Sequence, residues 1–250
     1  MKMLILFLAP LLAGLLIYLI PKARTSSFKL LLVFAGSYLF AITVIHILPE
    51  LYREYSEVKF IGLFVLLGFF LQQLLEYFTS GIEHGHIHSH DHQEQTHSHA
   101  HAEVSALMLL SALCIHAFLE GGMLARPHST LINSDVNAIL LGIVLHRAPA
   151  AFALMTVLTE QLHSRRRAIP YLVLFSVAAP LGLFVSEYFV EINLLSERGL
   201  IFLYALVSGN FLYISTTIVF ESSPEHHFNA KKLAVAIVGS LIAVAVEYMF

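Results

Sequence analysis

Eight long apolar stretches follow one another along this 250-residue chain, and they restrict its fold more than any other feature. A helix needs about 20 apolar residues to cross the hydrocarbon core of a bilayer, which is about 30 Å thick. Within that core a helix satisfies its own backbone hydrogen bonds, so the sequence predicts an all-α integral membrane protein with eight transmembrane helices. The stretches cover residues 3–20, 28–48, 58–80, 103–125, 136–158, 169–190, 199–221 and 231–250.

The composition agrees with a protein embedded in lipid. Only 12% of the residues are charged and 58% are hydrophobic, whereas soluble domains carry about 25% charged residues. The net charge of −3 offers no basic surface for nucleic acid, and the single cysteine, Cys114, excludes a disulfide framework. We expect one transmembrane domain over residues 1–250, and we interpret its first stretch as a spanning helix and not a cleaved signal peptide.

The basic residues between the stretches predict the orientation of the chain. One side holds Lys22, Arg24, Lys29, Arg165, Arg166, Arg167, Lys231 and Lys232. The other side holds Lys2, Arg53, Lys59, Arg126 and Arg198. Lysine and arginine accumulate in cytoplasmic loops, so the richer side is predicted to be cytoplasmic. This prediction puts both termini outside the cell membrane (plasma or inner) and the loop 81–102 inside.

That cytoplasmic loop is rich in histidine. Its histidines are His84, His86, His88, His90, His92, His97, His99 and His101. Imidazole binds zinc, copper and nickel, and a tract of this kind can surround an ion in several registers. A solvated linker or a pH-sensitive tract is the alternative, because histidine titrates near neutral pH. We interpret the loop as a set of metal contacts.

Ionisable residues also occur within the fourth and fifth stretches. An ionisable side chain at the centre of a bilayer costs about 2.5–3.5 kcal/mol, so such residues are candidates for function. His116 and Glu120 are four residues apart and lie on one helix face, while His146 and Arg147 stand at a similar depth in the next stretch. Two imidazoles and one carboxylate could hold a divalent ion. Pro149, close to His146, predicts a locally opened helix.

Two further pairs stand at the ends of stretches. His46 and Glu50 are four residues apart at the outer end of the second stretch, and His226 and His227 follow the seventh on the cytoplasmic side. They are candidates for an outer entrance and an inner exit for metal. Ordinary polarity of the membrane interface is the alternative for His46 and Glu50.

At these residues the sequence resembles the ZIP family of zinc and iron-regulated divalent metal transporters. The family carries a His-x-x-x-Glu-Gly motif in its fourth span, which reads here from His116 to Gly121, and a His-x-x-Pro motif in its fifth, which reads from His146 to Pro149. The His46-Ile-Leu-Pro-Glu50 segment and the position of the histidine-rich loop are similar too. The resemblance implies a bundle of eight helices that imports zinc, with the metal path between spans four and five and with His116, Glu120 and His146 as ligands.

The chain departs from the family pattern beside these ligands. Many bacterial members build a two-metal centre with Asn after the first motif histidine, Asn or Glu after the second, and a Glu four residues beyond the second. Ala117, Arg147 and Ala150 stand at those positions here. Arginine is a permanent cation that repels a second dication. We therefore predict a site for one metal, with Arg147 in the place of the second ion.

Other functions are compatible with the same residues. The three ligands could hold a catalytic zinc in an intramembrane hydrolase, or the protein could be a metal sensor that transports nothing. The sequence has no P-loop, and we expect no enzyme activity and no catalytic cofactor, with zinc or a similar ion as the transported substrate. Small residues on several spans would allow a homodimer.

Overall fold

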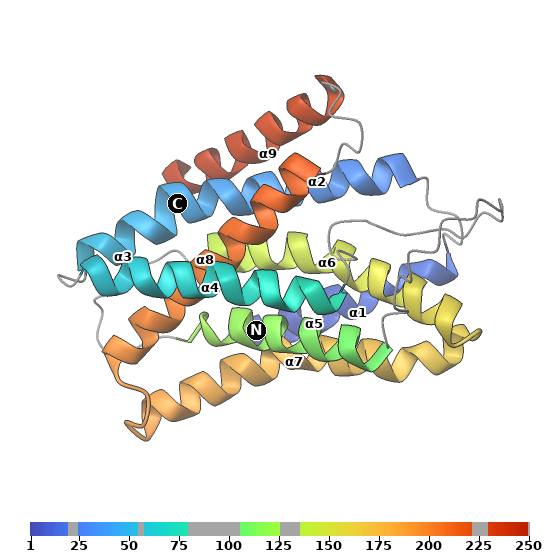
Figure 1. Ribbon diagram of the computed structural model, residues 1–250, viewed down its shortest axis with the longest axis horizontal. Coiled ribbons are helices and arrows are strands. Elements are labelled where there is room, and N and C mark those ends of the chain that lie inside the picture. Colours follow the sequence, from blue (N-terminus) through green and yellow to red (C-terminus); the bar gives the residue numbers. More distant parts are fainter. Residues whose placement is uncertain (20–24, 55–57, 80–105, 126–135, 222–229, 250) are drawn as a thin grey trace.

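The computed structural model describes residues 1–19, 25–54, 58–79, 106–125, 136–221 and 230–249, and every regular element in these ranges is helical (Figure 1). The helices form eight rods that follow the predicted stretches in order. The rods are α1 (Lys2–Leu15) with the 3-10 turn η1 (Leu16–Tyr18); α2 (Thr25–Ile42) with the π-helical turn η2 (Thr43–Ile47) and α3 (Leu48–Glu54); α4 (Val58–Thr79); α5 (Ala106–Gly122); α6 (Val136–Gln161); α7 (Arg165–Glu191); α8 (Glu197–Glu221); and α9 (Ala230–Met249).

The lengths of these rods support a multi-pass membrane protein. Five described stretches are long and apolar enough to cross a membrane: Lys29–Arg53, Val58–Tyr77, Asn137–Gln161, Arg165–Glu191 and Glu197–Val219. Lys2–Tyr18 and Leu107–Gly122 are apolar but shorter. α9 is apolar apart from three charged residues near its ends. The all-helical architecture is confirmed for the described residues, and the crossing by all eight rods stays a prediction.

The rods pack in two groups of four. In one group α5 packs along α7, and α1 packs on α6 and α7; in the other α4 packs along α8, and α2 packs on α8 and α9. Most rods follow the long axis of the molecule, α8 crosses obliquely, and α2 and α9 lie together at one edge (Figure 1). The groups meet where α2 contacts α6 and where α4 contacts α5. Between α2 and α6, the buried Tyr38 hydroxyl donates to the Ala138 carbonyl at 3.1 Å.

Glycines bring the backbones of α5 and α7 into direct contact. A Cβ added to Gly121 would overlap the Ala179 carbonyl, and one added to Gly182 would overlap the Phe118 carbonyl. Only a residue without a side chain permits this approach, as in other tightly packed membrane helices. The contact holds α7 close to the turn of α5 that carries His116 and Glu120.

The irregular helix turn lies in the second rod and not at Pro149. We expected Pro149 to open its helix, but α6 continues from Val136 to Gln161 without interruption. The lost backbone hydrogen bond is tolerated because neighbouring helices hold α6 on several sides. A π-helical turn instead interrupts the second rod at η2, which includes His46. Such turns are frequent at functional sites.

Candidate metal site

Two of the predicted ligands lie one turn apart on α5. His116 and Glu120 are separated by four residues, so a regular helix brings their side chains to one face. The Nε2 atom of His116 lies 3.0 Å from Oε1 of Glu120. The pair therefore offers one imidazole nitrogen and one carboxylate oxygen to the same small volume.

His146 completes the group from α6. Its Nε2 atom lies 3.9 Å from the same Glu120 Oε1, and its ring meets the ring of His116 edge to face with centroids 5.7 Å apart. One ligand atom from each residue lies within 4.8 Å of the other two. Around a tetrahedral zinc with bonds of about 2.0–2.1 Å, neighbouring ligand atoms lie about 3.3 Å apart. Small side-chain movements would bring these three atoms to that spacing.

The group is enclosed by the protein. The exposed fractions are 3% for His116, 0% for Glu120 and 1% for His146. A buried carboxylate is costly unless a positive group compensates it. The arrangement therefore suits a dication, with the fourth position open to water or another group.

A second positive group is already present beside Glu120. The Nε atom of Arg147, which is also 1% exposed, lies 3.9 Å from Oε2 of Glu120. Its Nη2 donates to the Phe175 carbonyl of α7 at 3.0 Å, and the guanidinium carbon lies 4.8 Å from the centre of the Phe175 ring. Sequence reasoning identified Arg147 but missed Phe175, because nothing in an apolar stretch marks one phenylalanine as the partner of a distant arginine.

The positions that would complete a two-metal centre are apolar and buried. Ala117 is 0% exposed and Ala150 is 4% exposed. Neither methyl group can bind a metal ion. In the part of the chain that the structure describes, His116, Glu120 and His146 are the group that could hold a metal ion.

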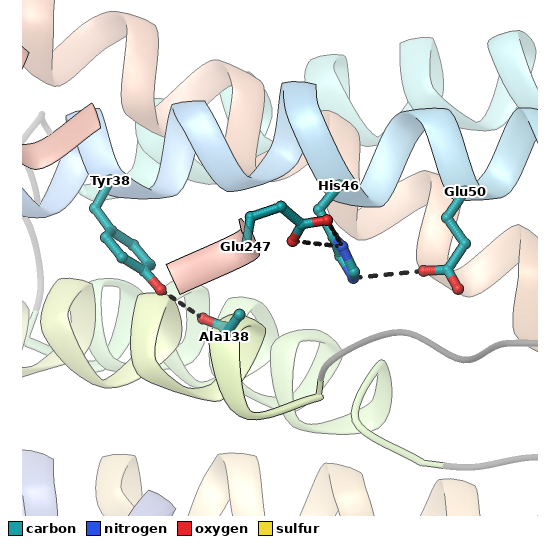
Figure 2. Close-up of polar contacts among 5 residues, drawn as sticks. All are labelled: Tyr38, His46, Glu50, Ala138 and Glu247. Atoms are coloured by element: carbon teal, nitrogen blue, oxygen red, sulfur yellow. Dashed lines mark hydrogen bonds and ion pairs between the residues drawn. The ribbon is translucent and has the colours of Figure 1, made fainter. Parts of the chain in front are cut away.

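A separate polar cluster joins the second rod to α9 (Figure 2). The Nδ1 atom of His46, in η2, lies 2.8 Å from the carboxylate of Glu247, and its Nε2 lies 3.5 Å from Glu50. The three side chains are only 11–22% exposed. Glu247 was missed by the sequence reasoning, although an acidic residue in an apolar final stretch was an available signal.

The cluster at His46 differs in geometry from the group at Glu120. The two carboxylates contact opposite nitrogens of one ring, so Figure 2 shows a chain of three groups across the imidazole. An imidazole gives a metal only one nitrogen. A metal ion at His46 would therefore replace one of the two carboxylates at the ring.

The remaining predicted contacts lie outside the described residues. They are the histidines of the loop 81–102 together with His226 and His227. Their assignment as loop and exit contacts stays a prediction.

Comparison with known proteins places these features in a family. A family model described as "ZIP Zinc transporter" matches residues 81–247. Zinc transporter ZIP9 of Macaca fascicularis is 35% identical over 113 residues, which cover 42% of this chain and 46% of the relative. Zinc transporter ZIP9-A of Xenopus laevis is 33% identical over 166 residues, which cover 63% of this chain and 50% of the relative. The chain spans about half the length of these relatives.

Proposed function

The chain belongs to the ZIP family of zinc transporters, and from this premise we propose that it imports zinc into the cytoplasm through its own helix bundle. His116, Glu120 and His146 would bind the ion in transit. The observation that carries the proposal is the convergence of two imidazoles and one carboxylate, fully buried, on one volume between two apolar helices. Family membership argues against the alternative of an intramembrane hydrolase.

An incomplete set of protein ligands suits transport. A transported ion must bind strongly enough to enter and weakly enough to leave, so an ion held by three protein ligands and exchangeable water can move on. Nitrogen and oxygen donors of this kind are preferred by zinc. Iron, manganese and cadmium are further candidate substrates, because imidazole and carboxylate also bind them.

We propose that the site holds one ion at a time. The guanidinium of Arg147 lies 3.9 Å from Oε2 of Glu120, whereas His116 is paired with Oε1, and Ala117 and Ala150 provide no ligand atom. A second dication would have to approach a permanent positive charge within a few ångströms. Metal titration that finds two intramembrane ions per chain would contradict this proposal.

The outer cluster is proposed as the entrance for metal. His46 and Glu50 stand at the predicted outer end of the second rod, and Glu247 adds a second carboxylate from α9. Acidic groups at the mouth of a pathway raise the local concentration of cations. The loop histidines and the pair His226 and His227 would receive the ion on the cytoplasmic side.

The predicted orientation and assembly complete the proposal. Both termini would lie outside, in the plasma or inner membrane, as the distribution of lysine and arginine indicates. A homodimer stays a prediction from the small residues of the spans. Labelling of single added cysteines from either side of the membrane would test the orientation of the termini.

Uptake of radioactive zinc tests the proposed function directly. The intact protein is compared with a His116→Ala/His146→Ala double variant and with a His163→Asn control, all at equal expression. His163 is exposed and has a φ of 50°, which asparagine accepts. We expect saturable uptake by the parent and the control, and none by the double variant. Equal uptake by all three would exclude these ligands, and zinc binding without any uptake would favour a sensor.

A further inference from the structure

Arg147 makes two contacts with Phe175 of α7, which is not one of the candidate metal ligands. Its Nη2 is hydrogen-bonded to the Phe175 carbonyl at 3.0 Å, and its guanidinium lies over the Phe175 ring at 4.8 Å. The side chain is almost completely buried. The guanidinium of Arg147, on α6, is therefore anchored to α7 through a residue that is not one of the three candidate metal ligands.

The two oxygens of Glu120 face different partners. Oε1 lies 3.0 Å from His116 and 3.9 Å from His146, whereas Oε2 lies 3.9 Å from Nε of Arg147. Oε1 is thus the oxygen paired with the two imidazoles, and Oε2 is the oxygen paired with the guanidinium. An ion held by the atoms that lie together here would receive one carboxylate oxygen and two ring nitrogens, while the second oxygen stays paired with the guanidinium.

The positive charge of Arg147 offsets the negative charge of Glu120. Glu120 is the acidic residue of the group, and Arg147 carries one permanent positive charge beside it. In the described part of the site, the net charge of the three candidate ligands and Arg147 is therefore close to zero when no metal ion is bound. A metal ion at these donors would be bound chiefly through the imidazole nitrogens and not through accumulated negative charge.

We infer that Arg147 is a specificity-determining residue that makes this site prefer zinc over hard, oxygen-seeking dications such as manganese. The inference rests on the proposed function. Imidazole suits zinc, copper and nickel, whereas manganese, calcium and magnesium prefer carboxylates, carbonyls and water in larger numbers. With Arg147 in place, the site offers one shielded carboxylate oxygen to a hard ion. Without that charge, Glu120 would offer both oxygens and its full negative charge.

The experiment is a competition between manganese and radioactive zinc for the purified full chain in detergent. Zinc retained by the His116→Ala/His146→Ala variant, which keeps the histidine-rich loop, is subtracted as background. The manganese concentration that displaces half of the remaining zinc is compared in the parent, Arg147→Met, Arg147→Lys and the exposed control Arg166→Met. Elution as a single species in gel filtration verifies that each variant is folded.

We expect Arg147→Met to lower the manganese concentration that displaces half of the zinc by about tenfold, after correction for any change in zinc affinity. Changes of this size are seen when residues that contact metal ligands are replaced. Arg147→Lys, which keeps the charge, and Arg166→Met should behave like the parent. An unchanged ratio in a folded Arg147→Met variant would overturn the inference. If that variant does not fold, a relaxed preference in Arg147→Lys overturns it, and a retained preference supports it.

The manganese competition and the zinc uptake experiment test the two proposals separately. Binding is measured without transport, so a parent that binds zinc at these ligands but moves none across a membrane would end the transport proposal alone. A parent that transports zinc, together with an unaltered preference in Arg147→Met, would end the inference about Arg147 alone.

Discussion

Replacing Glu120 with glutamine should destabilise the protein strongly in the absence of metal. The carboxylate and Arg147 are 0% and 1% exposed, and their nearest charged atoms lie 3.9 Å apart. In this variant Arg147 keeps its charge, because the guanidinium does not deprotonate in proteins. Its Nη2 bond to Phe175 remains, but no described carboxylate would face it. Breaking a buried pair by removing one partner costs about 3–5 kcal/mol.

This free energy corresponds to a measurable change in unfolding temperature. For a chain of this size, 1 kcal/mol shifts the midpoint by about 2–4 °C, so Glu120→Gln should lower it by roughly 6–20 °C. Circular dichroism of the purified protein in detergent with a chelator would follow the loss of helix. Glu187→Gln, at an exposed position of α7, is the matched control and should leave the midpoint unchanged.

The double variant Glu120→Gln/Arg147→Met shows whether Glu120→Gln loses stability because a buried charge is left unpaired or because packing is disturbed. Removal of both charges leaves no isolated ion in the interior, so most of the lost stability should return, as for other buried pairs replaced by apolar groups. Zinc binding at the site should not return, because the carboxylate is still missing. A Glu120→Gln variant as stable as the parent, or a double variant no more stable than Glu120→Gln, would refute the assignment of the pair.

Two further predictions concern helix contacts and the outer cluster. Gly182→Ala should cost about 1–3 kcal/mol or more, because the new Cβ would overlap the Phe118 carbonyl; thermal unfolding would measure it, with the tolerated Gly62→Ala, whose Cβ meets nothing closer than 3.6 Å, as control. Glu247→Gln should raise the half-saturating zinc concentration for uptake by about tenfold with little change in maximal rate, since a charge that concentrates the ion is lost. Uptake curves equal to those of Glu187→Gln would contradict it.

Features within a single helix, and the depth of a residue within its apolar stretch, could be predicted from the sequence. The apolar stretches located the eight rods, because a span needs a fixed number of consecutive apolar residues. The spacing of four between His116 and Glu120 placed both on one face of a helix, and the structure brings them within 3.0 Å. The convergence of His146 with them followed from its similar depth in the neighbouring span. Each of these predictions depends on local periodicity and on the cost of polar groups in lipid.

Contacts between distant helices were decided only by the tertiary structure. Nothing near Glu247 in the sequence indicates His46, two hundred residues away, and nothing near Phe175 indicates Arg147. Pro149 predicted an opened helix that packing keeps regular, while the π-helical turn formed elsewhere, around His46. The physical reason is that helix periodicity fixes which face a residue occupies, whereas its partner depends on how helices slide and rotate against one another. That register is set by contacts such as those of Gly121 and Gly182 with the opposing backbone, which form only in the assembled bundle.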